Sequence, residues 1–141
     1  MRVYIAAPFF NEEQLDFVKR IEKKLLWNEI QYFSPRDGGD IQKMNKREVK
    51  KVKREIYEDN INNIAGCDKI VAVIDDRDTG TIFEMGYAVA LGIPVISIAN
   101  CDHGVNIMLA EAVQAHVRNL GDMIRAISDS DFKGEEPAKL Y

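Results

Sequence analysis

Short apolar runs alternate with amphipathic segments along almost the whole chain, and this alternation strongly limits the possible folds. Strand-like runs occur at 2–8, 30–35, 68–75, 94–99 and 115–120. Helical patterns lie between and after them, at 12–27, 45–65, 80–92, 105–114 and 121–128. Strands that alternate with helices indicate an α/β fold with a parallel sheet. We therefore predict one domain over residues 1–141, a flavodoxin-like or Rossmann-like three-layer sandwich with a five-stranded, mostly parallel sheet.

The charge balance bears on possible partners. The formal net charge of −4 argues against nucleic acid as a main partner. A basic run at 43–54 resembles a nucleic-acid patch, but Glu48 and Glu55 interrupt or border it. The solvated face of a helix is the simpler interpretation of this run.

Several features indicate a cytoplasmic protein without a bound metal. Met1–Ile5 leads directly into a strand pattern instead of a signal peptide, and no apolar stretch is long enough to span a membrane. Cys67 and Cys101 lack metal-binding spacing and are expected to be reduced thiols. His103 and His116 form no ligand cluster, so we expect no structural metal site.

An acidic loop at 75–81 leads into the helix expected at 80–92, at the sheet edge where parallel α/β folds bind ligands. Glu84 lies about one turn inside this helix, and helical side chains lean back toward the helix start. We expect the helix dipole to keep Glu84 ionised, and neighbouring carboxylates to make Asp78 hold its proton more tightly. Such a pair fits retaining glycosyl transfer, in which one carboxylate attacks and a second group protonates the leaving group.

Simpler interpretations of the same residues remain open. Asp78 or Thr79 could merely cap the helix. The loop also lacks a dinucleotide or Walker fingerprint, and its negative charge would repel a pyrophosphate. Phe9 and Phe10, after the first strand, fit either the core or a surface that stacks on a planar base. Tyr4 could belong to the core, or its hydroxyl could orient the Glu84 carboxylate.

The helix at 45–65 carries a polar residue on its apolar face. The buried face is marked by Val49, Val52, Ile56 and Ile64. Four residues after Ile56 the same face reaches Asn60, with Asp59 beside it. An amide can hold a hydroxyl or a base edge, but it cannot transfer a proton as a carboxylate can.

Three motifs, taken together and in this order, resemble the nucleoside 2-deoxyribosyltransferases over nearly the whole chain. They are YIAAPFF at 4–10, D-x-G-T-x-x-E-x-G-Y-A-x-A-x-G-x-P at 78–94, and N-I-M at 106–108. The resemblance implies a nucleotide-salvage enzyme that exchanges the base of a 2′-deoxynucleoside with a free purine or pyrimidine base. It implies double displacement with retention, no cofactor, and a homo-oligomer built from dimers, often hexameric, with shared active sites.

The resemblance also implies roles for individual residues. In the Asp78–Gly80–Glu84 spacing, Glu84 matches the nucleophile that holds a covalent deoxyribosyl group, and Asp78 matches the acid beside the base. Tyr4 matches a tyrosine next to the nucleophile. Further matches are expected to contact the substrate: Phe9 and Phe10 in the pocket, Asn106 and Met108 in a neighbouring subunit's site, and a terminal tyrosine at Tyr141.

One position departs from the family, and two other functions remain in view. Many members carry an aspartate where this chain has Asn60, next to Asp59, which leaves base preference open. Related enzymes are 2′-deoxynucleoside 5′-monophosphate N-glycosidases, and Arg36, Gly38 and Gly39 could form part of their phosphate pocket. A non-catalytic nucleotide-binding module on the same fold is the third possibility.

Overall fold

The computed structural model describes all residues, 1–141, around one sheet of five parallel strands. The strands are β1 (Arg2–Ala6), β2 (Gln31–Phe33), β3 (Lys69–Val73), β4 (Val95–Ile98) and β5 (Ala115–Val117). Their order, β2-β1-β3-β4-β5, is the flavodoxin-like order, in which the chain reverses direction across the sheet between β1 and β3. The predicted α/β sandwich is confirmed, and the sheet is entirely parallel.

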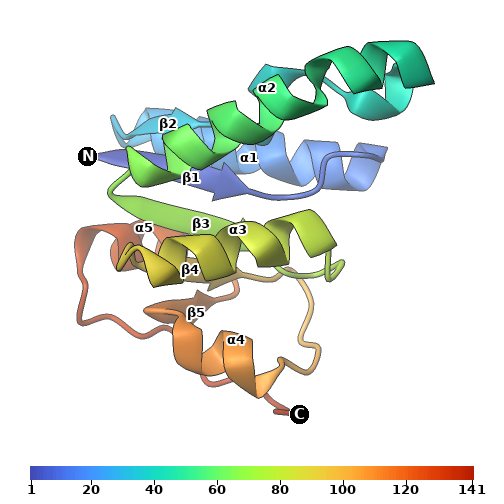
Figure 1. Cartoon of the computed structure of the whole chain (residues 1–141). Helices are drawn as coiled ribbons and strands as arrows, with labels where there is room; N and C mark the ends of the chain where they lie inside the picture. Colours follow the sequence, from blue (N-terminus) through green and yellow to red (C-terminus); the bar gives the residue numbers. More distant parts are fainter.

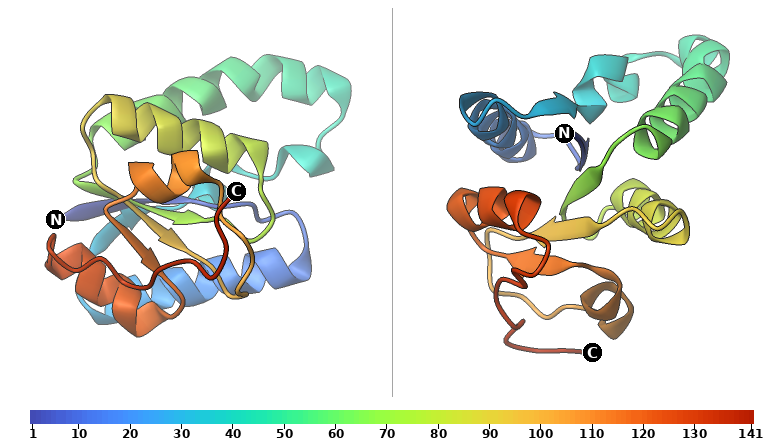
Figure 2. Two further views of the ribbon diagram at one scale, coloured as in Figure 1. Left: turned by 90° about the horizontal axis from the view of Figure 1, so that it is seen from below. Right: turned by 90° about the vertical axis from the view of Figure 1, so that its left-hand side faces the viewer.

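Helices cover both faces of the sheet (Figures 1 and 2). One face carries α1 (Glu12–Trp27) and α5 (Leu120–Ser128). The other carries α2 (Lys46–Ala65), α3 (Thr79–Ala90) and α4 (Ile107–Ala112). Two short 3₁₀ turns, at Pro35–Gly38 and Ile41–Lys43, occupy the segment between β2 and α2. None of the helices combines the length and apolar character that a membrane crossing requires.

The sheet separates two hydrophobic cores because neighbouring side chains of a strand point to opposite faces. On β1, Val3 and Ile5 pack toward α1 and α5, whereas Tyr4 and Ala6 pack toward α2 and α3. All five residues of β3 are buried. Because helices cover both faces of the sheet, the strand segments are nearly continuous apolar runs in the sequence.

Each α-helix begins directly after an Asn or Asp whose side chain accepts a hydrogen bond from a backbone N–H of the first turn. These residues are Asn11, Asn45, Asp78, Asn106 and Asn119. The helix predicted at 12–27 is found with those bounds. The one predicted at 105–114 is shorter because Asn106 is its cap and Val113 is already extended.

The segment after α5 was given no structure by the sequence, yet it pairs with the free edge of the sheet (Figure 2). The N–H of His116 donates to Lys133 O at 3.1 Å, and Glu135 N–H donates to His116 O at 2.8 Å. Gly134 lies between them with φ +75°, and a Cβ there would lie 2.0 Å from His116 O. Only glycine fits this approach.

Candidate active site

Glu84 and Tyr4 meet at the carboxyl edge of the sheet, beside the point where strand order reverses. Tyr4 lies on β1 with its side chain fully buried, and its hydroxyl donates to the Glu84 carboxylate. Glu84 lies in the second turn of α3 and is half-buried. The two residues are 80 positions apart in the sequence, and the parallel sheet brings them together.

The protonation of Glu84 is set mainly by burial. Burial raises the pKa of Glu84 to about 7, the Tyr4 hydrogen bond lowers it, and the charge of Asp78 raises it. Burial, together with the nearby Glu84 charge, also raises the pKa of Tyr4 well above its ordinary value, so Tyr4 stays a donor. The expectation that the helix dipole keeps Glu84 firmly ionised is therefore wrong. The dipole acts mainly within the first turn, and Glu84 lies beyond it.

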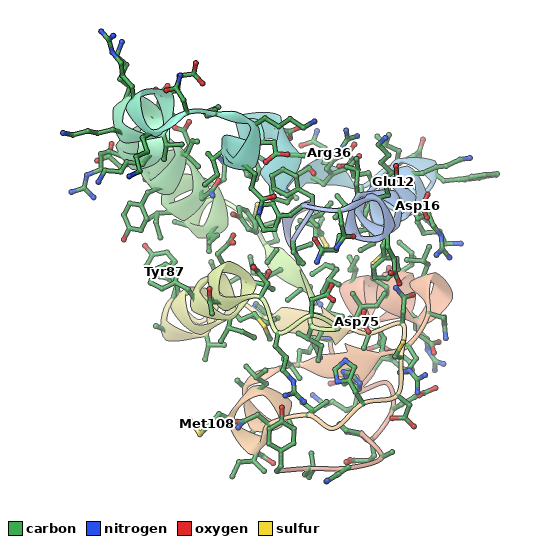
Figure 3. All side chains as sticks on the ribbon, turned by 90° about the vertical axis from the view of Figure 1, so that its right-hand side faces the viewer. Glu12, Asp16, Arg36, Asp75, Tyr87 and Met108 are labelled. Carbon is green, nitrogen blue, oxygen red and sulfur yellow. The ribbon has the colours of Figure 1, made fainter.

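Asp78 is the N-cap of α3, which was one of the two roles that the sequence left open for it. Its Oδ2 accepts from Thr81 N at 2.9 Å and from Thr81 Oγ1 at 3.0 Å. The other carboxylates of this loop also have partners. Asp75, near the centre of Figure 3, accepts from Asn100 N at 3.0 Å, and Asp76 accepts from Gln14 Nε2 at 3.1 Å. The carboxylates of the acidic loop thus form hydrogen bonds that fix the loop and the start of α3.

A pocket of about 360 Å³ opens between α2 and α3, with Glu84 in its wall. The lining residues are Tyr57, Asn60, Ile61, Ile64, Gly80, Phe83 and Glu84. Asn60 is half-buried in this pocket, whereas Asp59 is exposed outside its lining. The helical period of α2 therefore predicted correctly which of the two polar residues turns inward.

Other predicted substrate contacts lie outside this pocket. Phe9 is half-buried against the α1 and α5 core, and Phe10 is exposed. Asn106 caps α4, and Met108, on its first turn, is 74% exposed. Figure 3 shows Met108 on the same outer face as Tyr87 of α3. Tyr141 stacks near Arg77, with the guanidinium carbon 5.2 Å from the ring centroid.

Sequence reasoning missed three aromatic residues around Glu84. Phe33, at the end of β2, stacks on the Tyr4 ring with centroids 5.2 Å apart. Tyr57 and Phe83 face each other across the pocket between α2 and α3, with centroids 6.3 Å apart. Both are about half exposed, at 47% and 53%. Two features of the sequence could have indicated the pair: Phe83 directly precedes Glu84, and Tyr57 lies one helical turn before Asn60, on the same side of α2.

The arginine considered for a phosphate pocket is already engaged. Arg36 donates through Nε to Glu22 Oε1 at 2.7 Å and through a terminal nitrogen to Glu22 Oε2 at 2.6 Å. Ser34 Oγ also donates to Glu22 at 2.5 Å. Burial raises the pKa of Glu22, but the hydrogen bonds from Arg36 and Ser34 outweigh it and lower the pKa overall. Arg36 therefore neutralises a buried carboxylate.

The family follows from a match over most of the chain. A model of the family described as nucleoside 2-deoxyribosyltransferase matches residues 3–124, which include both Tyr4 and Glu84. The chain belongs to the nucleoside 2-deoxyribosyltransferase family. A comparison with characterised protein sequences found no match.

Solved structures share the fold of this family member. The 2-deoxyribosyltransferase of the psychrotolerant bacterium Bacillus psychrosaccharolyticus is 24% identical, with a TM-score of 0.81 over 96% of this chain and 100% of that one. A conserved protein of Enterococcus faecalis V583 is 19% identical, with a TM-score of 0.54 over 96% and 81%. The CMP N-glycosidase of Clostridium botulinum is 16% identical, with a TM-score of 0.51 over 100% and 89%. At these identities the likeness shows the fold.

Proposed function

We propose that the protein is a nucleoside 2-deoxyribosyltransferase that exchanges the base of a 2′-deoxynucleoside through a covalent deoxyribosyl-Glu84 intermediate. The observation that carries this proposal is the Glu84 carboxylate, held by the buried Tyr4 hydroxyl in the wall of an open pocket. Family membership supports the same reaction class.

In the first half-reaction, a Glu84 carboxylate oxygen attacks C1′ of the sugar and forms a C–O bond. The C1′–N bond breaks, its electron pair stays on the base nitrogen, and the base takes up a proton before it leaves. In the second half-reaction, a nitrogen of another base attacks C1′ and the base gives up a proton to water or to Asp78. The C1′–O bond breaks, and its electron pair returns to the Glu84 carboxylate. Two inversions give net retention.

Burial of Glu84 favours this chemistry. An ionised carboxylate in a poorly solvated site is costly, and the neutral ester of the intermediate relieves that cost. The Tyr4 hydroxyl keeps one carboxylate oxygen occupied and so orients the other toward the pocket. The departing base would take its proton from water or from the carboxyl form of Asp78, the N-cap of α3.

The remaining pocket residues suggest how the substrate is held. Tyr57 and Phe83 offer aromatic surfaces to the planar base or to the apolar face of the sugar. Asn60 offers both a donor and an acceptor without adding a charge beside Glu84. A neutral side chain at this position suits a base edge that presents mixed donors and acceptors.

A dimer with shared sites also forms part of the proposal. Asn106 and Met108 do not line the Glu84 pocket of their own subunit, and α4 exposes Ile107 and Met108. Exposed apolar side chains lie on α2, α3 and α4 or, for Leu91, directly after α3: Tyr57, Phe83, Val89, Leu91, Ile107 and Met108. Such a surface is suited to a second copy of the chain.

A second candidate, a 5′-monophosphate N-glycosidase, is favoured by one observation. Lys53, Arg54 and Tyr57 line a further pocket on α2, and Tyr57 also belongs to the Glu84 pocket. These two cations could receive a phosphate. Against this, Arg36 is paired with Glu22, and Arg54 pairs with Glu58 at 3.4 Å. We therefore rank the unphosphorylated substrate first.

The test is an exchange assay. The protein is incubated with a 2′-deoxynucleoside and a different free base, and products are separated by chromatography across purine and pyrimidine donors. We expect exchanged nucleoside, and donor incubated without acceptor should leave a deoxyribosyl group on the peptide that contains Glu84. Glu84→Gln should lose activity by several orders of magnitude, as for other nucleophiles. Exposed Glu55→Gln is the matched control.

The alternatives give different results in the same assay. Base release from a 5′-monophosphate without acceptor, with little exchange of unphosphorylated donors, would favour the N-glycosidase. Binding of nucleosides without any turnover, unchanged by Glu84→Gln, would favour a non-catalytic module. Either result would remove the transferase proposal.

A further inference from the structure

Phe33 supports the Tyr4 ring from outside the Glu84 pocket. The two residues are direct partners across β1 and β2, and Phe33 is the last residue of β2 that pairs with β1. Their rings are stacked, with centroids 5.2 Å apart and 16° between the ring planes. Phe33 does not line the pocket, so its contact with the site runs through Tyr4, whose hydroxyl donates to Glu84.

The strand that carries Phe33 gives it little support. β2 is an edge strand of three residues and pairs with β1 alone. Its pairing stops at Phe33, and a 3₁₀ turn begins at Pro35. A short edge strand has low local stability, so the position of Phe33 depends on what holds the chain directly after it.

A buried carboxylate on the opposite face of the sheet holds the chain at this point. Ser34 continues the extended backbone, so its side chain points toward α1 whereas Phe33 packs toward α2 and α3. Glu22 of α1 is 5% exposed, and its Oε1 accepts from Ser34 Oγ at 2.5 Å and from Arg36 Nε at 2.7 Å. Its Oε2 accepts from a terminal nitrogen of Arg36 at 2.6 Å. We call Glu22, Ser34 and Arg36 the carboxylate clamp.

The carboxylate clamp is firm at both of its ends. On α1, Glu22 lies beside Ile21 and one turn before Leu25, both fully buried. At the turn, the N–H of Ser34 donates to Asp37 Oδ2 at 3.1 Å, and Asp37 N–H donates to Ser34 O at 3.0 Å. A two-pronged arginine–carboxylate pair fixes direction as well as distance. The end of β2 is therefore tied to a packed helix.

We propose that the carboxylate clamp, acting through Phe33, positions Tyr4 and so aims the Glu84 carboxylate at C1′ of the sugar. Phe33 and Glu22 are positioning residues, because neither lines the pocket. The proposal rests on the proposed function. If the Tyr4 ring can tilt, its hydroxyl holds the carboxylate less firmly, and the attacking oxygen is less often in line with C1′.

Phe33→Leu removes the stacked ring, and Glu22→Gln removes the charge that Arg36 pairs with. Each should lower kcat about tenfold and leave the donor KM within about twofold, because substrate touches neither residue. Burial raises the pKa of Glu84 and the Tyr4 hydrogen bond lowers it. A weaker bond should therefore move the acidic limb of the kcat/KM profile up by about half a pH unit.

A double-mutant cycle shows whether Phe33 acts through Tyr4. In a Tyr4→Phe background the hydroxyl is gone, so adding Phe33→Leu should change neither kcat nor the acidic limb by more than about twofold or about 0.2 pH unit. Full effects of Phe33→Leu in that background would overturn the proposal.

Lys69→Met is the matched control for Glu22→Gln, because each removes one buried charge. Lys69 is also 5% exposed, and its Nζ donates to Gln114 Oε1 at 2.9 Å, Ala126 O at 3.1 Å and Ser130 Oγ at 3.0 Å. Lys69→Met should lower stability but keep kcat and the acidic limb near wild type. A control that loses kcat and shifts the limb as Glu22→Gln does would overturn the positioning role.

Ser34→Ala serves if Glu22→Gln folds poorly, because it keeps the Arg36–Glu22 pair and removes one hydrogen bond. It should lower kcat about threefold, with the same direction of shift in the acidic limb. Unchanged kcat and limb in both Ser34→Ala and Phe33→Leu would overturn the proposal.

A measurement without turnover separates this proposal from the proposed function. The protein is labelled with ¹³C at glutamate carboxyl carbons, the Glu84 signal is assigned by its loss in Glu84→Gln, and its titration is followed by NMR. Phe33→Leu should move the midpoint up by about half a pH unit. No exchange by the wild type would refute the proposed function, whereas exchange with an unmoved midpoint in Phe33→Leu would refute the positioning role alone.

Discussion

Replacing Glu84, the proposed nucleophile, should stabilise the protein, and the gain should grow with pH. Burial raises the pKa of Glu84 from 4.5 to about 7, so the folded protein holds the proton more tightly than the unfolded chain does. Stability is therefore highest while Glu84 is protonated, and it falls as pH rises between these two values. Glu84→Gln has no charge to bury and keeps an oxygen that can accept from Tyr4.

The magnitude follows from the two pKa values. A rise from 4.5 to about 7 corresponds to about 3 kcal/mol once the carboxylate is ionised in both states. At pH 5 the unfolded chain is already largely ionised while the folded protein is not, so the cost is about 1 kcal/mol. The stability advantage of Glu84→Gln should thus grow by about 2 kcal/mol between pH 5 and pH 8.

Urea unfolding followed by circular dichroism at pH 5, 6, 7 and 8 measures this difference directly. Glu55→Gln, on the exposed side of α2, controls for the loss of one negative charge. A Glu84→Gln advantage that is the same at all four pH values would refute the claim that burial of this carboxylate dominates its titration.

Three further predictions follow from the same contacts. Tyr4→Phe removes a hydrogen bond that lowers the Glu84 pKa, so the acidic limb of the kcat/KM profile should move to higher pH. Asn60→Asp places a second carboxylate in the Glu84 pocket, and the acidic limb should again move up, by about 1 pH unit. Gly134→Ala puts a Cβ 2.0 Å from His116 O, and should cost about 2 kcal/mol or more in thermal or urea unfolding, or detach the tail from β5.

Much of the fold could be predicted because its local signals agree with one another. The alternation of strand and helix patterns predicted all five strands in a parallel sheet, and the Asn or Asp caps mark the helix starts. The sequence left Tyr4 between a place in the core and a role in orienting Glu84, and the structure shows that the buried Tyr4 does both. The side-chain period of α2 correctly turned Asn60, rather than Asp59, toward the pocket.

The ionisation of Glu84 could not be predicted from spacing because it is a balance of tertiary effects. Position near a helix start suggested a stabilised charge, but burial under α2 and beside β1 reverses the sign. The extent of desolvation depends on which side chains cover the carboxylate. That information is spread over segments up to 80 residues apart in the sequence.

The pairing of the tail with β5 could not be predicted for a related reason. A polar segment with a glycine carries no apolar period, so its pairing rests on main-chain hydrogen bonds and on the contact of Gly134 with His116. Main-chain pairing of this kind tolerates many side chains, so it leaves little trace in the side-chain pattern of the sequence. Gly134 is the exception, because only glycine fits where the two backbones meet.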